Sequence, residues 1–249
     1  MGKLVPFISE KFDGVIWRME TDVLTDTVFI ESRNAEDHLV TFSAIDLNNG
    51  SVKYKNIAVD EKWLTGIDIA YKGILLLHGF QNENSPVHKG LVAIDDNGKV
   101  LWSNYTYAFD YLSDQGPVVY NTQLQPKKPF IIDVFTGDNI QIASGFGSEL
   151  DKQVTYPDSA FENLNIQLPV KAVSNSTYYL RHGSFIIVSL HAVSNSGFNQ
   201  YLFVLQNNAV VFEDILNSNI QKQQPEAFIL YKNCLLYIKN KSELKVLNL

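Results

Sequence analysis

Five stretches of this chain repeat one short pattern, an apolar strand followed by a tight turn and a second strand. Three copies carry an Asp just before the turn, and the last copy ends after its first strand. The copies are AIDLNNGSVKY (44–54), AIDDNGKVLW (93–102), IIDVFTGDNIQI (131–142), FVLQNNAVVF (203–212) and LKVLNL (244–249). Recurring units of short antiparallel strands are typical of repeat architectures and favour a β-propeller. The sequence therefore predicts an all-β propeller with one copy in each blade.

The spacing of the copies indicates how many blades there are. Three of the four intervals between equivalent positions are 49, 38 and 42 residues, and a blade of four short strands needs about 40–50. The interval from Asp133 to Leu205 is 72 residues, which could hold a degenerate sixth blade or an insertion. An insertion is favoured, because residues 144–171 are rich in Gly, Ser, Asp, Asn and Pro and show little alternation. We expect five blades, with six as the alternative, in a single domain over 1–249 with an irregular excursion at about 144–171.

An apolar run precedes each copy and predicts a strand covered on both faces. These runs are rich in β-branched, leucine and aromatic residues and are bounded by turn-forming residues. They lie at 28–30, 74–77, 118–120, 185–188 and 235–238. One such run for each copy agrees with the count of five.

The two ends of the chain are expected to meet. The final copy, 244–249, has no outer strand after it, whereas GVIWRM at 14–19 resembles the outer strands KVLW and AVVF. A propeller whose first and last blades are not joined leaves sheet edges open. The prediction is therefore that the N-terminal strand at 14–19 completes the last blade. The alternative is that 14–19 belongs wholly to the first blade.

Composition and charge narrow the classes of partner. The chain is 45% hydrophobic and carries a formal net charge of −7, and it lacks the basic patch that a nucleic-acid partner requires. Cys234 is the single cysteine, so no internal disulfide or multi-cysteine metal site can form. No stretch has the length and hydropathy of a signal peptide or a membrane-spanning helix. We expect a cytoplasmic monomer with no nucleic-acid or membrane partner.

The copy at 93–102 resembles the repeat of quinoprotein-type (PQQ-like) β-propellers, whose blades carry an Ala-x-Asp…Gly…Trp pattern. The copy at 44–54 matches with Tyr54 in place of the tryptophan. The whole chain is also similar to an uncharacterised bacterial family of about 250–260 residues with no assigned function. That family has Ile-Trp-Arg followed by Ile-Glu-x-Arg-Asn, here at 16–18 and 30–34. The quinone-dependent enzymes have eight blades, an adjacent cysteine pair and a bound calcium, so a shorter chain with one cysteine implies neither a PQQ cofactor nor a metal.

Three candidate site residues follow the inner apolar runs: Glu31, His78 and His191. If the repeats are in register, all three emerge at the same end of the propeller and could face one mouth. Glutamate and histidine are typical of acid–base pairs and metal sites. Ends of hairpins exposed to solvent favour the same residues, so this hypothesis stands beside a purely structural interpretation.

Other conspicuous residues have structural interpretations. The repeated Asp46, Asp95 and Asp133 are expected to accept backbone N–H groups in Asx turns. Large aromatic side chains are expected to fill the space between blades; these are Trp17, Tyr54 and Trp102. The histidines without a repeat equivalent are assigned to the surface; these are His38, His88 and His182.

The function itself is not indicated by any local motif, since GxSxG, HExxH, CxxC and a phosphate-binding loop are all missing. The leading hypothesis is a non-enzymatic binding or interaction module for a protein or glycan. Its surface would include the 144–171 excursion, with Phe146, Tyr156 and Phe161 as possible anchors. The alternative is a carbohydrate-active hydrolase or lyase in the central channel, which needs two facing carboxylates, with Asp13, Glu31, Asp68 and Asp110 as candidates by number alone.

Overall fold

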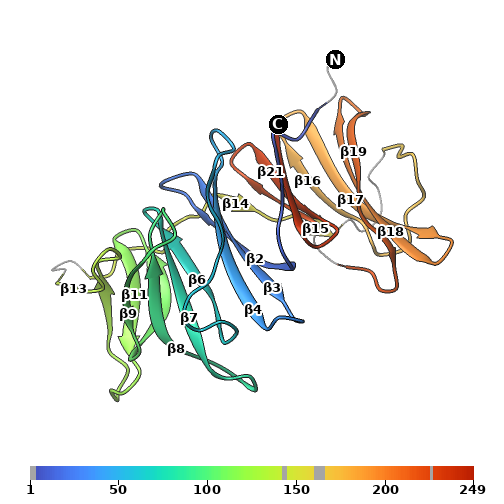
Figure 1. Ribbon diagram of the computed structural model, residues 1–249. Coiled ribbons are helices and arrows are strands. Elements are labelled where there is room, and N and C mark those ends of the chain that lie inside the picture. The colour runs from blue at the N-terminus through green and yellow to red at the C-terminus, as the bar shows by residue number, and fades with distance from the viewer. Residues whose placement is uncertain (1–3, 142–144, 160–165, 225–226) are drawn as a thin grey trace. The chain divides into compact units, whose positions relative to one another are not determined.

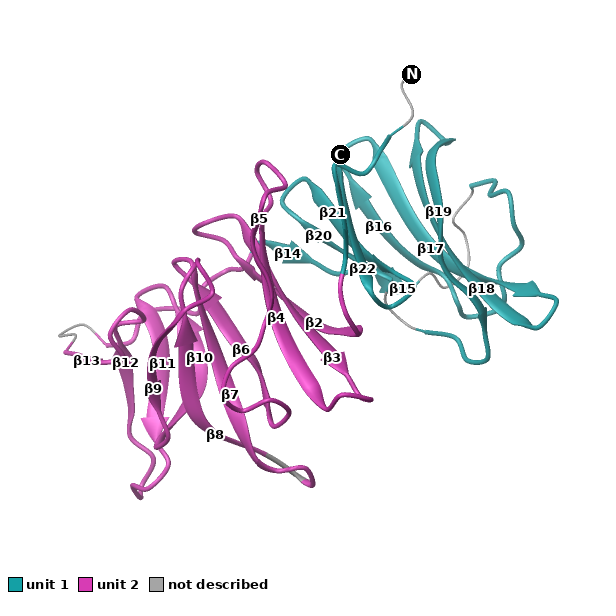
Figure 2. Ribbon diagram, viewed as in Figure 1, with its two compact units in different colours: residues 1–11, 153–249 teal, residues 12–152 magenta. Residues whose placement is uncertain are grey.

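A computed structural model describes residues 4–141, 145–159, 166–224 and 227–249. The fold is all-β, with 60% of residues in strands, no helix among the residues described, and five antiparallel sheets (Figure 1). The described part of the chain accordingly contains no helix that could cross a membrane. The all-β prediction is confirmed, and the strands divide between two compact units, 12–152 and 1–11 with 153–249 (Figure 2).

The unit formed by 12–152 contains three sheets whose strands lie side by side in chain order. The first sheet consists of β2 (Val15–Asp22), β3 (Thr27–Asn34), β4 (Leu39–Asp46) and β5 (Val52–Ile57). The second consists of β6 (Thr65–Tyr71), β7 (Ile74–Asn82), β8 (Ser85–Ile94) and β9 (Val100–Asn104). The third consists of β10 (Tyr107–Ser113), β11 (Gly116–Asn121), β12 (Pro129–Ile132) and β13 (Asn139–Ile140).

The other unit contains two sheets of five strands. One sheet has the order β15 (Asp158–Ser159), β16 (Tyr178–His182), β17 (Phe185–Ser194), β18 (Gly197–Gln206) and β19 (Ala209–Ile220). The other has the order β1 (Ile8–Lys11), β22 (Glu243–Asn248), β21 (Cys234–Lys239), β20 (Phe228–Tyr231) and β14 (Val154–Thr155). Within 145–177, the described residues form only β14 and β15, each of which adds to the edge of one of these sheets.

Each sequence repeat lies in a sheet of its own. The first three copies form the third and fourth strands of their sheets, the fourth copy forms β18 and β19, and the last copy forms β22. The five apolar runs form the strand before each copy, in β3, β7, β11, β17 and β21. Residue 142, at the end of the third copy, lies outside the described residues. The buried side chains of neighbouring sheets share cores; for example, Phe29 and Phe42 pack with Ile67 and Leu75.

The prediction that an N-terminal strand pairs with the final strand is correct, but the residues predicted to form that strand are wrong. The strand beside β22 is β1, with Ile8 opposite Val246. Residues 14–19 instead lie largely in β2, which pairs with β3 in the first sheet, so the alternative interpretation holds. Ile8 is only 3% exposed and makes the apolar contact that 14–19 was expected to make. The apolar pattern could not distinguish these two segments, because both carry apolar residues suited to a strand.

The structural interpretation of the repeated aspartates is confirmed. A carboxylate oxygen of each accepts the backbone N–H two residues later, at 2.8 Å for Asp46, 2.9 Å for Asp95 and 2.7 Å for Asp133. Trp102 also behaves as expected, because its indole N–H donates to the Val134 carbonyl of the next sheet at 2.9 Å. Trp17 does not, since 69% of it is exposed.

Candidate functional site

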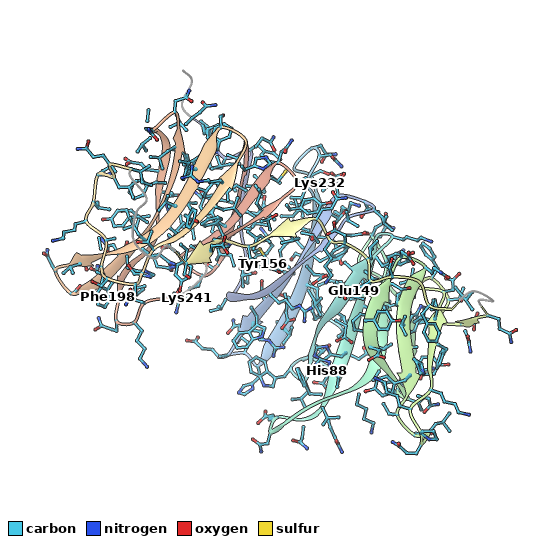
Figure 3. The ribbon with its side chains drawn as sticks, turned by 180° about the vertical axis from the view of Figure 1, so that it is seen from behind. His88, Glu149, Tyr156, Phe198, Lys232 and Lys241 are labelled. Carbon is cyan, nitrogen blue, oxygen red and sulfur yellow. The ribbon has the colours of Figure 1, made fainter. Side chains whose placement is uncertain are left out.

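The candidate site lies in the 12–152 unit, at one end of the first two sheets. Antiparallel pairing places the end of β7 beside the beginnings of β6 and β8, and Glu31 near the end of β3 bonds to the Ile67 backbone in β6. Figure 3 labels His88 on β8 near this end. The polar side chains that meet there are Glu31, Arg33, Asp68, His78 and His88.

Asp68, His78 and His88 form a compact group, here named the histidine cluster. The Nδ1 atoms of His78 and His88 lie 2.8 and 3.1 Å from the same Asp68 oxygen, Oδ1. The two imidazole rings are stacked, with centroids 3.5 Å apart and planes 8° apart. Phe80 packs edge-on against both rings. The cluster is therefore held by one carboxylate and one aromatic neighbour.

Burial and charge in the histidine cluster are unequal. The side chains of Asp68 and His78 are 4% and 5% exposed, whereas that of His88 is 37% exposed. Burial of Asp68 opposes its ionisation, but the hydrogen bonds from His78 and His88 outweigh that effect and hold its pKa below the ordinary value. Asp68 Oδ2 and His78 Nε2 are buried without a hydrogen-bond partner. Unpaired buried polar atoms are costly and call for an explanation.

Glu31, by contrast, has both carboxylate oxygens engaged. Oε1 accepts from Arg33 Nε at 2.7 Å, and Oε2 accepts from the backbone N–H of Ile67 in β6 at 2.9 Å. Arg33 also donates to the Thr65 carbonyl at 2.7 Å. The Glu31–Arg33 pair thus joins the first sheet to the second.

Gly66 separates the Glu31 carboxylate from the His78 ring. A Cβ at this position would lie 3.1 Å from His78 Nε2 and 3.2 Å from Glu31 Oε2. Both distances are tighter than ordinary side-chain contact, so the glycine leaves a small space between the two side chains. Glu31 and His78, two of the three candidate site residues, therefore border the same small space.

A cavity of about 350 Å³ opens beside these residues. The Arg33 guanidinium lies 5.5 Å from the ring centroids of both Trp17 and Trp63, an arrangement that fixes a planar cation between two indoles. The side chains that line the cavity and matter for its chemistry are Arg33, Trp63, Phe80, Asn82, Glu83 and Asn84. The cavity is named the Arg33 cavity below.

The third predicted residue, His191, lies in the other unit, on β17. It is 1% exposed, its Nε2 accepts the Gln224 backbone N–H at 3.1 Å, and its Nδ1 has no partner. Burial lowers the pKa of His191 below its ordinary value, and the smaller opposing effect of the Ser176 backbone does not cancel this. These contacts are those of a neutral histidine within a folded unit.

The sequence analysis did not predict that Asp68 and His88 belong to one cluster with His78. His88 was assigned to the surface, but it is half-buried beside His78 and Asp68. Asp68 appeared only among numerical carboxylate candidates. The sequence feature that could have indicated the cluster is the β7–β8 hairpin, which brings His78 and His88 close together. Bulges in the β6–β7 and β7–β8 pairs, however, prevent the register from being read from the sequence.

The surface expected at 144–171 is described only in part. Tyr156 is 63% exposed and Phe146 is half-buried. Residue 144 and Phe161 lie outside the described residues.

Comparison with known proteins matches part of the chain to a family without an assigned role. Residues 21–102 match the model of a domain of unknown function (DUF4905), which confirms in coarse form the expected similarity to an uncharacterised family. The matched segment contains the Ile30–Asn34 stretch and the whole histidine cluster. No curated protein matches the chain.

Two solved structures show a weak likeness. Raptor of Chaetomium thermophilum has 8% identity and a TM-score of 0.34, over 99% of this chain and 29% of that one. A glucose dehydrogenase has 11% identity and a TM-score of 0.25, over 100% of this chain and 85% of that one. This chain thus spans less than a third of the Raptor chain, and neither likeness carries an inference about fold or function.

Proposed function

We propose that the five sheets are blades of a β-propeller and that the protein is a non-enzymatic binding module for a glycan, held at the Arg33 cavity. The propeller is supported by one sequence repeat in each sheet and by the pairing of β1 with β22. A crystal structure in which the five sheets do not surround a common axis would refute this part of the proposal.

The glycan assignment is carried by the Arg33 cavity. Its volume of about 350 Å³ falls in the range of small-molecule sites, about 300–1,000 Å³. Trp63 and Phe80 offer flat apolar faces for the C–H face of a sugar ring, and Asn82 and Asn84 offer amide donors and acceptors for hydroxyl groups. Arg33 adds donors in a fixed plane.

The experiment is a glycan array followed by calorimetry with the best ligand. Trp63→Ala should weaken binding at least about fivefold, because removing an aromatic anchor costs more than about 1 kcal/mol. Phe135→Ala is the matched control, since Phe135 is 49% exposed in the same unit and does not line the cavity. Failure of every glycan to bind, or equal affinity for Trp63→Ala and the wild type, would contradict the proposal.

The alternative of a carbohydrate-active hydrolase or lyase remains a prediction. Glu31 is 2% exposed and its two oxygens accept hydrogen bonds from Arg33 and from the Ile67 backbone, so its carboxylate is buried within the fold and does not open to solvent. Turnover of a bound glycan that disappears in Glu31→Gln would favour this alternative over a binding module.

A further inference from the structure

We propose that the histidine cluster binds a divalent transition-metal ion of the Zn²⁺ class through one Asp68 oxygen and one nitrogen each of His78 and His88. The three side chains each offer a ligand atom, and these atoms lie within 4.8 Å of one another. Two imidazoles with a carboxylate form a donor set typical of Zn²⁺ and Fe²⁺ sites with open positions. The proposal is independent of glycan binding, and it departs from the metal-free expectation based on sequence.

The separations between the ligand atoms suit such an ion. Bonds of about 2.0–2.2 Å in tetrahedral geometry place neighbouring ligand atoms roughly 3.3 Å apart. The Asp68 Oδ1 to Nδ1 separations of 2.8 Å for His78 and 3.1 Å for His88 are slightly shorter. The two oxygen-to-nitrogen separations therefore need to lengthen only slightly to admit an ion.

The ring orientation shows which ligand must move. Because the two rings are stacked within 8°, the lone pairs of their Nδ1 atoms are nearly parallel and do not point at one ion. His78 is 5% exposed and packed against Phe80, whereas His88 is 37% exposed and lies near a register irregularity of the β7–β8 pair. His88 has the room to turn, so His78 and Asp68 form the fixed part of the site.

The unpaired atoms around the cluster agree with this assignment. Asp68 Oδ2 and His78 Nε2 are buried without hydrogen-bond partners. When His78 Nδ1 binds an ion, the proton of the neutral ring resides on Nε2, which faces the space beside Gly66. Glu31 Oε2 borders the same space. A carboxylate that receives the second N–H of a liganding histidine is a recurring feature of metal sites.

The test uses the untagged, full-length protein after treatment with a chelator. Zn²⁺ is titrated by calorimetry, and Co²⁺ is titrated by visible absorption, which reports its coordination. The wild type should bind one equivalent, with a Co²⁺ spectrum of low coordination number. His88→Phe keeps a stacked aromatic face but offers no nitrogen, and it should weaken Zn²⁺ binding at least about 100-fold.

The controls separate a loss of ligand from a loss of fold. His182→Ala removes a histidine of the other unit, which bonds to Asn233, and should leave affinity unchanged. Circular dichroism establishes that each variant is folded, and His88→Ala replaces His88→Phe if the latter is not. The proposal is overturned if the wild type shows no saturable one-equivalent binding, or if the folded His88 variant binds Zn²⁺ as tightly as the wild type.

Discussion

The imidazole rings of His78 and His88 lie 3.5 Å apart in a parallel stack, and both present Nδ1 to one oxygen of Asp68. Neutral rings in this arrangement each use the Nδ1–H tautomer, because the carboxylate can only accept. A single buried carboxylate thus satisfies two donors from neighbouring strands.

Asp68→Ala should destabilise the protein by about 1–3 kcal/mol, since it leaves two imidazole donors without their acceptor. The measurement is urea unfolding with a chelator present, followed by tryptophan fluorescence. All three tryptophans lie in the 12–152 unit, so the signal reports on the unit that contains the cluster. Asp110→Ala, which removes a surface ion pair with Lys127, should cost less than about 0.5 kcal/mol; equal losses for the two variants would show that the cluster is not a stabilising element.

Gly66→Ala should cost about 1–3 kcal/mol of unfolding free energy, because the new Cβ meets His78 and Glu31 at 3.1 and 3.2 Å. The loss should be smaller in a His78→Ala background, where the ring is no longer in the way. A double-mutant cycle measures this coupling. Strictly additive effects would mean that the Cβ clashes elsewhere.

Stability of the unit that contains His191 should fall as the pH is lowered. The pKa of His191 is lowered in the folded protein, so the unfolded chain binds more protons below its ordinary value of about 6.5. The contribution of neutral His191 to the free energy of unfolding is complete above about pH 6.5 and is lost progressively as the pH falls below that value. Hydrogen exchange of β17 amides between pH 7.5 and 5.5 checks the wild type against His191→Gln, which should show the weaker dependence. Identical pH dependence in the two proteins would assign the effect to other groups.

Ile8→Asp should cost roughly 2–4 kcal/mol, because it buries a charge at a position that is 3% exposed in the strand beside β22. Val5→Asp is the control, since Val5 is 73% exposed. Thermal unfolding followed by circular dichroism compares them. A midpoint for Ile8→Asp that matches the control would mean that β1 contributes little to this sheet.

The sequence predicted those parts of the fold that depend on local pattern. Runs such as 74–77 became strands with both faces covered, and turns such as that after Asp95 formed as expected, because both depend on neighbouring residues. The partner of the final strand was misassigned, since any apolar strand of suitable length could pair with β22. Local pattern does not identify a partner more than two hundred residues away.

The site was predictable only in part for a similar reason. Glu31 and His78 were found because the repeats share a register, and their proximity at Gly66 follows from it. Asp68 occupies a register irregularity between Ile67 and Ile69, and His88 has no counterpart in other repeats. Functional residues at irregular positions of this kind cannot be identified from a repeat pattern, because the other repeats have no equivalent position.

The pairing of β1 with β22 also sets an order of events during synthesis. Residues 12–152 form a contiguous unit, which can fold while the ribosome is still translating the remainder, as segments nearer the N-terminus generally do. The strand at Ile8–Lys11 is made before this unit but has no partner until 243–248 has been made. A strand made before the 12–152 unit is thus paired only after that unit is complete, and until then the nascent chain must keep this strand from pairing with other strands.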